Sequence, residues 1–252
     1  MNKRIAIVSG GSGGLGKEYA NLLNAEYPQC DEYWLLGRRQ DKLDAACAEI
    51  PKANGIRIDL TCKEDMAKFN ALLVSQKPDI CLLINNAGCG YLGAFDQSKP
   101  EEQERTVQLD VAAFTMLTHA CLPYMSQGAQ IICISSIAGF VPNINMAVYS
   151  ASKSYVLAFC RALREELKPR GINVLAVCPG PMETEFLSIG RIKGNSKTFD
   201  TLPYCDAKKV AANSIAASKR GHAVYTPKLF YKFYRVLAHI LPKCLLMKLA
   251  KT

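Results

Sequence analysis

The last part of the chain, residues 207–252, contains no aspartate and no glutamate. Its ten lysines and arginines account for the whole formal charge of +9, so the remainder of the chain is close to neutral. The basic character therefore belongs to the C-terminal segment and says little about the rest of the protein. No recognition motif for nucleic acid accompanies these cations, and we expect no nucleic-acid partner.

Long apolar runs and metal-binding patterns are also missing. No run approaches the length of a membrane span, and the apolar residues 5–8 are too few for a signal peptide. The 11 cysteines, an odd number, include no Cys-x-x-Cys pair, and the 3 histidines lack metal-ligand spacing. We therefore expect reduced core thiols, no metal site and a cytoplasmic protein.

Short apolar runs alternate with helical patterns along the chain. The runs predict strands at residues 4–8, 33–36, 55–60, 80–84, 131–134, 172–177 and 224–225, with helices that include residues 63–75, 100–124 and 147–167. This alternation indicates an α/β fold: one doubly wound, Rossmann-type domain over residues 1–252. We expect a parallel sheet of about seven strands with helices on both faces.

A glycine-rich turn follows the first predicted strand. Glycines in such a turn let the backbone approach a pyrophosphate, and the next helix offers free amides and the positive end of its dipole. The pattern therefore predicts a dinucleotide site. Its residues are Gly10, Ser12, Gly13, Gly14, Leu15 and Gly16, spaced as Gly-x-x-x-Gly-x-Gly.

Two arginines, Arg38 and Arg39, follow the second predicted strand. In NAD-binding units an acidic residue at this place accepts a hydrogen bond from the ribose 2′-hydroxyl, whereas a guanidinium pairs with a 2′-phosphate. The alternative is a solvated charge pair before a helix. Because the acidic residue is missing, we predict NADP(H) as the cofactor.

Tyr149 and Lys153 are four residues apart in a predicted helix, so both side chains lie on one face. The ammonium of Lys153 favours tyrosinate and lowers the pKa of the phenol. Ser136, at the end of a predicted strand, can hold a substrate oxygen before that phenol. Together the three residues indicate acid–base chemistry on a carbonyl or alcohol. Taken alone, the tyrosine and lysine also fit an ordinary helix-surface pair.

Residues with chemical roles follow the ends of several predicted strands. Because ligands of open parallel sheets bind at the carboxyl ends of the strands, we expect these residues to meet at one edge. They are Gly10, Arg38, Asp59, Asn86, Ser136 and Pro179.

These motifs, in this order, resemble the short-chain dehydrogenase/reductase (SDR) family over nearly the whole chain. The resemblance implies that the glycine-rich turn cradles the pyrophosphate and that further residues contact the dinucleotide. Those residues are Asp59 and Leu60 at the adenine, Asn86, Ala87 and Gly88 along the cofactor, and Pro179, Gly180 and Thr184 towards the nicotinamide.

The same resemblance implies the catalytic roles. Tyr149 is the general acid in reduction and the general base in oxidation. Lys153 binds the nicotinamide ribose and lowers the pKa of Tyr149, and Ser136 orients the substrate oxygen. The family's homodimers and homotetramers imply a homo-oligomer built on the helices at residues 100–124 and 147–167.

Asp110 stands where the family often has an asparagine that supports a proton relay to the lysine. Two interpretations stay open. Asp110 is a working substitute that accepts from a relay water, or it is a helix-face residue and the relay is organised differently. In the first case its charge stabilises the cation of Lys153 and opposes tyrosinate formation.

Two further segments have no assigned motif. Residues 181–205 are the least regular part of the chain; the family resemblance implies a substrate lid there, and the alternative is a plain surface loop. Residues 226–252 form a basic amphipathic extension. Its apolar side is expected to pack on the body, the substrate pocket or a sister subunit; the alternative is peripheral contact with an anionic membrane.

We therefore predict an NADP(H)-dependent oxidoreductase that interconverts an alcohol and a ketone or aldehyde. The substrate is expected to be apolar, such as a hydroxysteroid, an acyl carbonyl compound or a xenobiotic ketone. The alternative is a non-catalytic regulatory protein that binds NADP(H) on the same fold.

Overall fold

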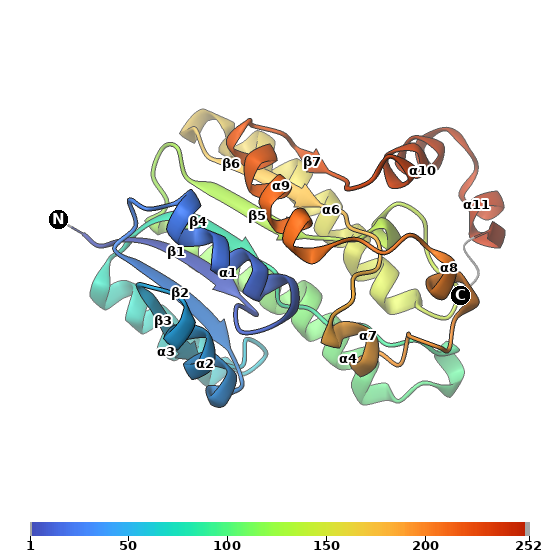
Figure 1. Cartoon of the computed structure of the whole chain (residues 1–252), viewed down its shortest axis with the longest axis horizontal. Helices are drawn as coiled ribbons and strands as arrows, with labels where there is room; N and C mark the ends of the chain where they lie inside the picture. Colours follow the sequence, from blue (N-terminus) through green and yellow to red (C-terminus); the bar gives the residue numbers. More distant parts are fainter. Residues whose placement is uncertain (1, 250–252) are drawn as a thin grey trace.

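The computed structural model of the chain describes residues 2–249, and within them seven strands form one parallel sheet (Figure 1). The strand order is β3-β2-β1-β4-β5-β6-β7. The predicted doubly wound, Rossmann-type fold is confirmed. The strands are β1 (Arg4–Ser9), β2 (Glu32–Gly37), β3 (Ala53–Arg57), β4 (Asp79–Asn85), β5 (Gln130–Ile134), β6 (Asn173–Val177) and β7 (Val224–Tyr225).

Helices cover both faces of this sheet. α1 and α9 lie side by side in front of it in Figure 1, joined by a 2.5 Å hydrogen bond between Tyr19 Oη and Ser214 Oγ, and α6 lies behind it. The helices are α1 (Gly14–Glu26), α2 (Gln40–Glu49), α3 (Lys63–Gln76), α4 (Pro100–Val107), α5 (Phe114–Cys121), α6 (Ala147–Leu167), α7 (Glu185–Ile189), α8 (Lys197–Thr201), α9 (Ala207–Lys219), α10 (Leu229–Ile240) and α11 (Lys243–Leu249).

The central strand explains why the first apolar run is continuous. Residues 5–8 of β1 are fully buried because β2 and β4 flank the strand and helices cover both of its faces. The chain runs from β1 outward to β2 and β3, then returns to β4 on the other side of β1. This reversal opens a crevice at the carboxyl ends of β1 and β4, where such sheets bind ligands.

The third strand begins and ends earlier than predicted. It runs over Ala53–Arg57 instead of residues 55–60, in register with β2. Asp59 cannot continue it, because its carboxylate accepts hydrogen bonds from the amide and hydroxyl of Thr61, at 3.0 and 2.7 Å. Asp59 therefore lies in a turn past the end of the strand.

The helix predicted at residues 100–124 is continuous but changes its winding. After α4 the chain forms a π-helical segment, η2 (Gln108–Ala113), before α5 and a 3₁₀ turn, η3 (Leu122–Tyr124). Asp110 lies in η2 and is only 1% exposed. π-Helical turns are rare and often occur at functional sites.

The segment at residues 181–205 contains the two short helices α7 and α8. Its ends meet, because the amide of Cys205 donates to the carbonyl of Pro181 at 2.7 Å. Leu187, Ile192 and Phe199 of this segment pack with Met146 in a small apolar cluster that is separate from the main core.

The C-terminal extension folds into α10 and α11 at one end of the molecule (Figure 1). Residues 250–252 of the predicted extension lie outside the described residues. Within residues 2–249, no helix combines the length and the apolar character that crossing a bilayer would need.

Candidate active site

A cleft of about 410 Å³ lies at the carboxyl edge of the sheet. The loops after strands β1 to β6 line it together with the segment at residues 181–205. Of the residues predicted to contact a dinucleotide, only Gly16 is not on its wall. The structure thus brings the predicted motifs together around one cleft.

In the first turn, the structural reason for a glycine differs between positions. A Cβ on Gly16 would lie 2.0 Å from the carbonyl oxygen of Gly10, so glycine is required for α1 to pack against the turn. Gly10 itself has a φ of +66°, which favours glycine. A Cβ on Gly13, in contrast, would meet nothing closer than Arg39, at 4.0 Å. The space over Gly13 is open cleft, which fits a phosphate cradle.

This contrast gives a matched pair of substitutions. Gly16→Ala is expected to lower the free energy of unfolding by about 1–3 kcal/mol, because the added methyl overlaps backbone. Gly13→Ala should leave stability nearly unchanged and weaken dinucleotide binding about tenfold, because its methyl enters the cradle. Thermal unfolding and cofactor titration of both variants measure this. Unchanged cofactor affinity in Gly13→Ala would exclude the turn as the phosphate site.

Ser9, at the end of β1, ties the glycine-rich turn to the loop after β4. Its hydroxyl accepts hydrogen bonds from the amides of Asn86 and Ala87, at 2.9 and 3.0 Å. The side-chain amide of Asn86 returns a 3.0 Å bond to the carbonyl of Ser9. Ser9 therefore sets the spacing of the two loops, a role that the sequence motif did not reveal.

Cations gather at the far end of the cleft. Arg38 lies 3.8 Å from the carboxylate of Asp59, which Arg105 also approaches, at 3.6 Å. Arg39 forms a 2.8 Å ion pair with Glu185. Lys42 contacts the same carboxylate.

Four cations therefore border the place where the second strand ends, and they form two pairs: Arg38 and Arg105 approach Asp59, and Arg39 and Lys42 contact Glu185. Sequence reasoning predicted the two arginines but missed Arg105, Lys42 and Glu185. No local motif marks these three residues, because they come together from three helices: Lys42 from α2, Arg105 from α4 and Glu185 from α7.

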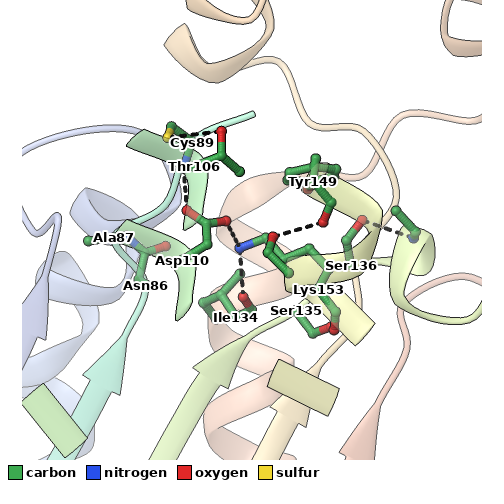
Figure 2. Close-up of polar contacts among 12 residues, drawn as sticks. Asn86, Ala87, Cys89, Thr106, Asp110, Ile134, Ser135, Ser136, Tyr149 and Lys153 are labelled. Atoms are coloured by element: carbon green, nitrogen blue, oxygen red, sulfur yellow. Dashed lines mark hydrogen bonds and ion pairs between the residues drawn. The ribbon is translucent and has the colours of Figure 1, made fainter. Parts of the chain in front are cut away.

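Lys153 and Asp110 form a buried ion pair beside Tyr149 (Figure 2). The ammonium lies 2.8 Å from Asp110 Oδ2 and donates to the carbonyl of Ile134 at 3.2 Å. Asp110 Oδ1 accepts from the amide of Cys89 at 2.8 Å. The Lys153 nitrogen is 5.6 Å from the centre of the Tyr149 ring.

Asp110 is therefore not a solvent-exposed helix-face residue. It holds the lysine directly, from the π-helical segment, without a bridging group. Of the two interpretations that the sequence left open, this geometry favours Asp110 as a working part of the site, with a direct contact to the ammonium in place of one through a relay water.

The electrostatics of Tyr149 differ from the simple expectation. Burial raises the pKa of the phenol and the Lys153 ammonium lowers it, while the Asp110 carboxylate raises it again. The net result is a pKa above the ordinary value of a tyrosine. The predicted effect of Lys153 is present but burial outweighs it. Burial lowers the pKa of Lys153, yet Asp110 and Tyr149 raise it further, so the amine stays a cation. Tyr149 is thus a protonated acid beside a fixed positive charge.

Ser136 is oriented by the chain that follows it. Its hydroxyl oxygen accepts the amide of Ala138 at 3.2 Å and caps the short 3₁₀ helix η4 (Ile137–Gly139). The hydroxyl also lies within hydrogen-bond reach of the Tyr149 phenol, where it lowers the pKa of that phenol, and both residues line the cleft. The serine can therefore donate to an oxygen that is held in front of the phenol.

Residues from two other segments enclose the tyrosine ring. The ring centres of Tyr149 and Phe186 of α7 are 5.6 Å apart. A Cβ on Gly90 would lie 2.4 Å from the Tyr149 ring, so only glycine fits there. Sequence reasoning missed both residues, because their importance depends on how the loops fold back over α6.

The family comparison agrees with this arrangement. The family model described as short chain dehydrogenase matches residues 4–191. Serine 3-dehydrogenase of Agrobacterium fabrum is 30% identical over 216 residues, 83% of this chain and 84% of that protein. The very-long-chain 3-oxoacyl-CoA reductase of Bos taurus is 31% identical over 221 residues, 83% of this chain and 69% of that protein.

A solved structure extends the similarity beyond the matched residues. A short-chain dehydrogenase from Sphingobium yanoikuyae, in complex with NADPH, superposes with a TM-score of 0.81 at 27% identity, covering 98% of this chain and 95% of that one. The fold, the motif order and the matched family model lead to one conclusion: the chain belongs to the short-chain dehydrogenase/reductase family of oxidoreductases.

Proposed function

We propose that the protein is an NADP(H)-dependent oxidoreductase that interconverts an alcohol with a ketone or aldehyde. The observation that carries this proposal is the arrangement of Ser136, Tyr149 and Lys153 at one wall of a cleft whose other end carries cations. The nicotinamide would supply the hydride when bound. The protein's own residues supply the proton and the positions of the reactants.

The residues of the cleft fit a dinucleotide. The open space over Gly13 and the free amides at the start of α1 suit a pyrophosphate. Asn86, Ala87, Gly88, Pro179, Gly180 and Thr184 would hold the nicotinamide half, and Asp59 and Leu60 the adenine. Arg38 and Arg39 would bind a 2′-phosphate.

The steps assigned to the chain itself are few. In reduction, Ser136 donates a hydrogen bond to the carbonyl oxygen, and Tyr149 transfers its phenolic proton to that oxygen. The Lys153 ammonium stabilises the tyrosinate that results, and Asp110 keeps the ammonium in place. The raised pKa of Tyr149 keeps the phenol protonated at neutral pH, which suits reduction better than oxidation.

Apolar side chains near Tyr149 support an apolar substrate. They come from the lid segment at residues 181–205 and from the loop after β4, and they enclose the cleft beside the phenol. They are Tyr91, Met182, Phe186, Leu187, Ile189 and Phe199. We propose that this end of the cleft takes the carbonyl-bearing chain or ring system.

We retain a homo-oligomer as part of the proposal. Val107, Met116 and Tyr155 expose 47%, 53% and 37% of their surfaces on α4, α5 and α6. These helices are those through which the family resemblance implies assembly. Their exposed apolar groups support such an interface.

The function is tested by measuring NADPH oxidation against a panel of ketones, aldehydes, steroids and acyl carbonyl compounds, with NADH as control. The proposal expects turnover with at least one apolar carbonyl compound, faster with NADPH. Tight NADPH binding without turnover of any compound would favour the non-catalytic regulatory alternative.

Arg38 provides a sharper test of cofactor choice. Arg38→Gln is expected to weaken NADPH binding by about tenfold to a hundredfold, because a charge-assisted contact to phosphate is lost. NADH affinity should change little. Fluorescence titration of both nucleotides measures the ratio, and Arg220→Gln, an exposed arginine at the end of α9, is the matched control. Equal losses for both nucleotides would contradict a 2′-phosphate site.

A further inference from the structure

Helix α10 contacts the body of the protein with one face only. Tyr231 is fully buried, Ala238 is nearly so, and the phenol of Tyr231 donates to the carbonyl of Pro203 at 2.9 Å. A Cβ on Gly180 would lie 2.3 Å from the same ring. The helix is thus fixed against the cleft wall and the lid segment.

The opposite face of α10 carries large apolar side chains into solvent. Leu229, Phe233, Val236 and Ile240 are 82%, 62%, 52% and 71% exposed. Their spacing of four, three and four residues places them in one stripe along the helix, and Phe230, 54% exposed, borders it. Leu245 of α11 adds another exposed apolar group. Stripes of this kind on a protein surface mark interaction sites.

Cations flank the stripe. By helical geometry, Lys232 and His239 lie on the flank between the apolar stripe and the buried face, and both are exposed. Lys228, Lys243 and Lys248, near the helix ends, are exposed as well. No acidic residue in residues 207–252 offsets these charges. The surface therefore combines an apolar stripe with positive charge along one flank and near the ends of the helix.

The apolar stripe and its neighbouring positive charges distinguish between two possible binding partners, a second copy of the chain and an anionic lipid surface. A second copy docking symmetrically would bring one basic surface against another, because a two-fold interface pairs a patch with itself. An anionic lipid surface satisfies both features, since acyl chains accept the apolar stripe and headgroups pair with the lysines. We propose that α10 and α11 bind this protein peripherally to an anionic bilayer, with the stripe at the headgroup–acyl boundary.

The position of α10 beside the lid segment links membrane binding to access of the substrate. Figure 1 shows α10 and α11 at the end of the molecule that also carries α8 of the lid segment. The Tyr231 contacts link the helix to Gly180 and Pro203, which lie at the cleft wall and the lid segment. Docking through the stripe would therefore hold the lid segment close to the bilayer, where apolar substrates concentrate. The docking itself does not depend on the proposed function.

Vesicle flotation with the full chain tests the proposal. Wild type is expected to float with vesicles of phosphatidylcholine and phosphatidylglycerol and to float less as salt is raised. The double variant Phe233→Ser, Val236→Ser should lose about tenfold or more of this binding. Val74→Ser is the matched control, because Val74 is 61% exposed on the distant helix α3. It should bind as wild type does.

The substituted side chains are exposed at the surface, so we expect the variants to fold. Thermal unfolding at the same temperature as wild type verifies this. Unchanged vesicle binding in the double variant would overturn the proposal. So would an absence of binding by wild type together with a smaller solution mass of the double variant, because that result would assign the stripe to a second copy. None of these measurements requires enzymatic activity, so they test the membrane proposal independently of the proposed reaction.

Discussion

Replacing Tyr149 by Phe is expected to lower kcat for carbonyl reduction by about a thousandfold, which lies within the usual contribution of a positioned general acid. The phenyl ring keeps the contacts to Phe186 and Gly90, but it has no proton to give. NADPH affinity should be largely unchanged, because the glycine-rich turn and the arginines are untouched. Steady-state kinetics and cofactor titration separate the two effects.

Tyr155→Phe is the matched control for this change. Tyr155 lies in the same helix, α6, with its hydroxyl bonded to Thr115 at 2.8 Å and away from the cleft. Its variant should keep wild-type kcat. If Tyr149→Phe kept its turnover, the phenol would not be the proton donor. If a biological effect survived the loss of turnover, the regulatory alternative would gain support.

Removing the Asp110 carboxylate is expected to produce the largest loss of stability. Asp110→Ala leaves the buried Lys153 ammonium without its counter-ion, and breaking such a pair costs about 3–5 kcal/mol of the free energy of unfolding. Denaturant unfolding measures this. The control is Glu26→Ala, which removes a half-exposed pair with Lys219 and should cost about 1 kcal/mol or less. A similar small cost for both variants would exclude the pair as an anchor of the site.

Asp110→Asn tests the electrostatic role through the pH profile of reduction. Reduction needs protonated Tyr149, so its rate falls as pH rises through the pKa of the phenol. The Asp110 carboxylate raises that pKa, and its removal should move the alkaline limb to lower pH. A limb that stays in place, or moves to higher pH, would contradict a charge effect of Asp110 on the phenol.

The fold could be predicted because its signals are local and repeated. Residues 5–8 are apolar throughout since β1 is covered on both faces, and the glycine-rich turn directly follows this strand. The parallel topology then brings the strand ends to one edge. The strand at residues 53–57 was harder to place, because the turn chemistry of Asp59, rather than apolar character, ends it.

The candidate site was predictable only as a set of residues. The sequence pairs Tyr149 with Lys153 through helical spacing, but it carries no distance from Asp110 to Lys153. That contact depends on the π-helical winding of η2. The net rise in the pKa of Tyr149 depends on its burial, to which residues 181–205 and the loop after β4 contribute through Phe186 and Gly90. Likewise, Glu185 reaches Arg39 across 146 residues of sequence, which no local pattern encodes.

Crystallising the protein with NADPH and a carbonyl ligand tests the central claim most directly. The account predicts the pyrophosphate over Gly13, the 2′-phosphate against Arg38 and Arg39, and the ligand oxygen within hydrogen-bond reach of the hydroxyls of Tyr149 and Ser136. Electron density that put the nicotinamide ring away from Tyr149, or the dinucleotide outside this cleft, would contradict it.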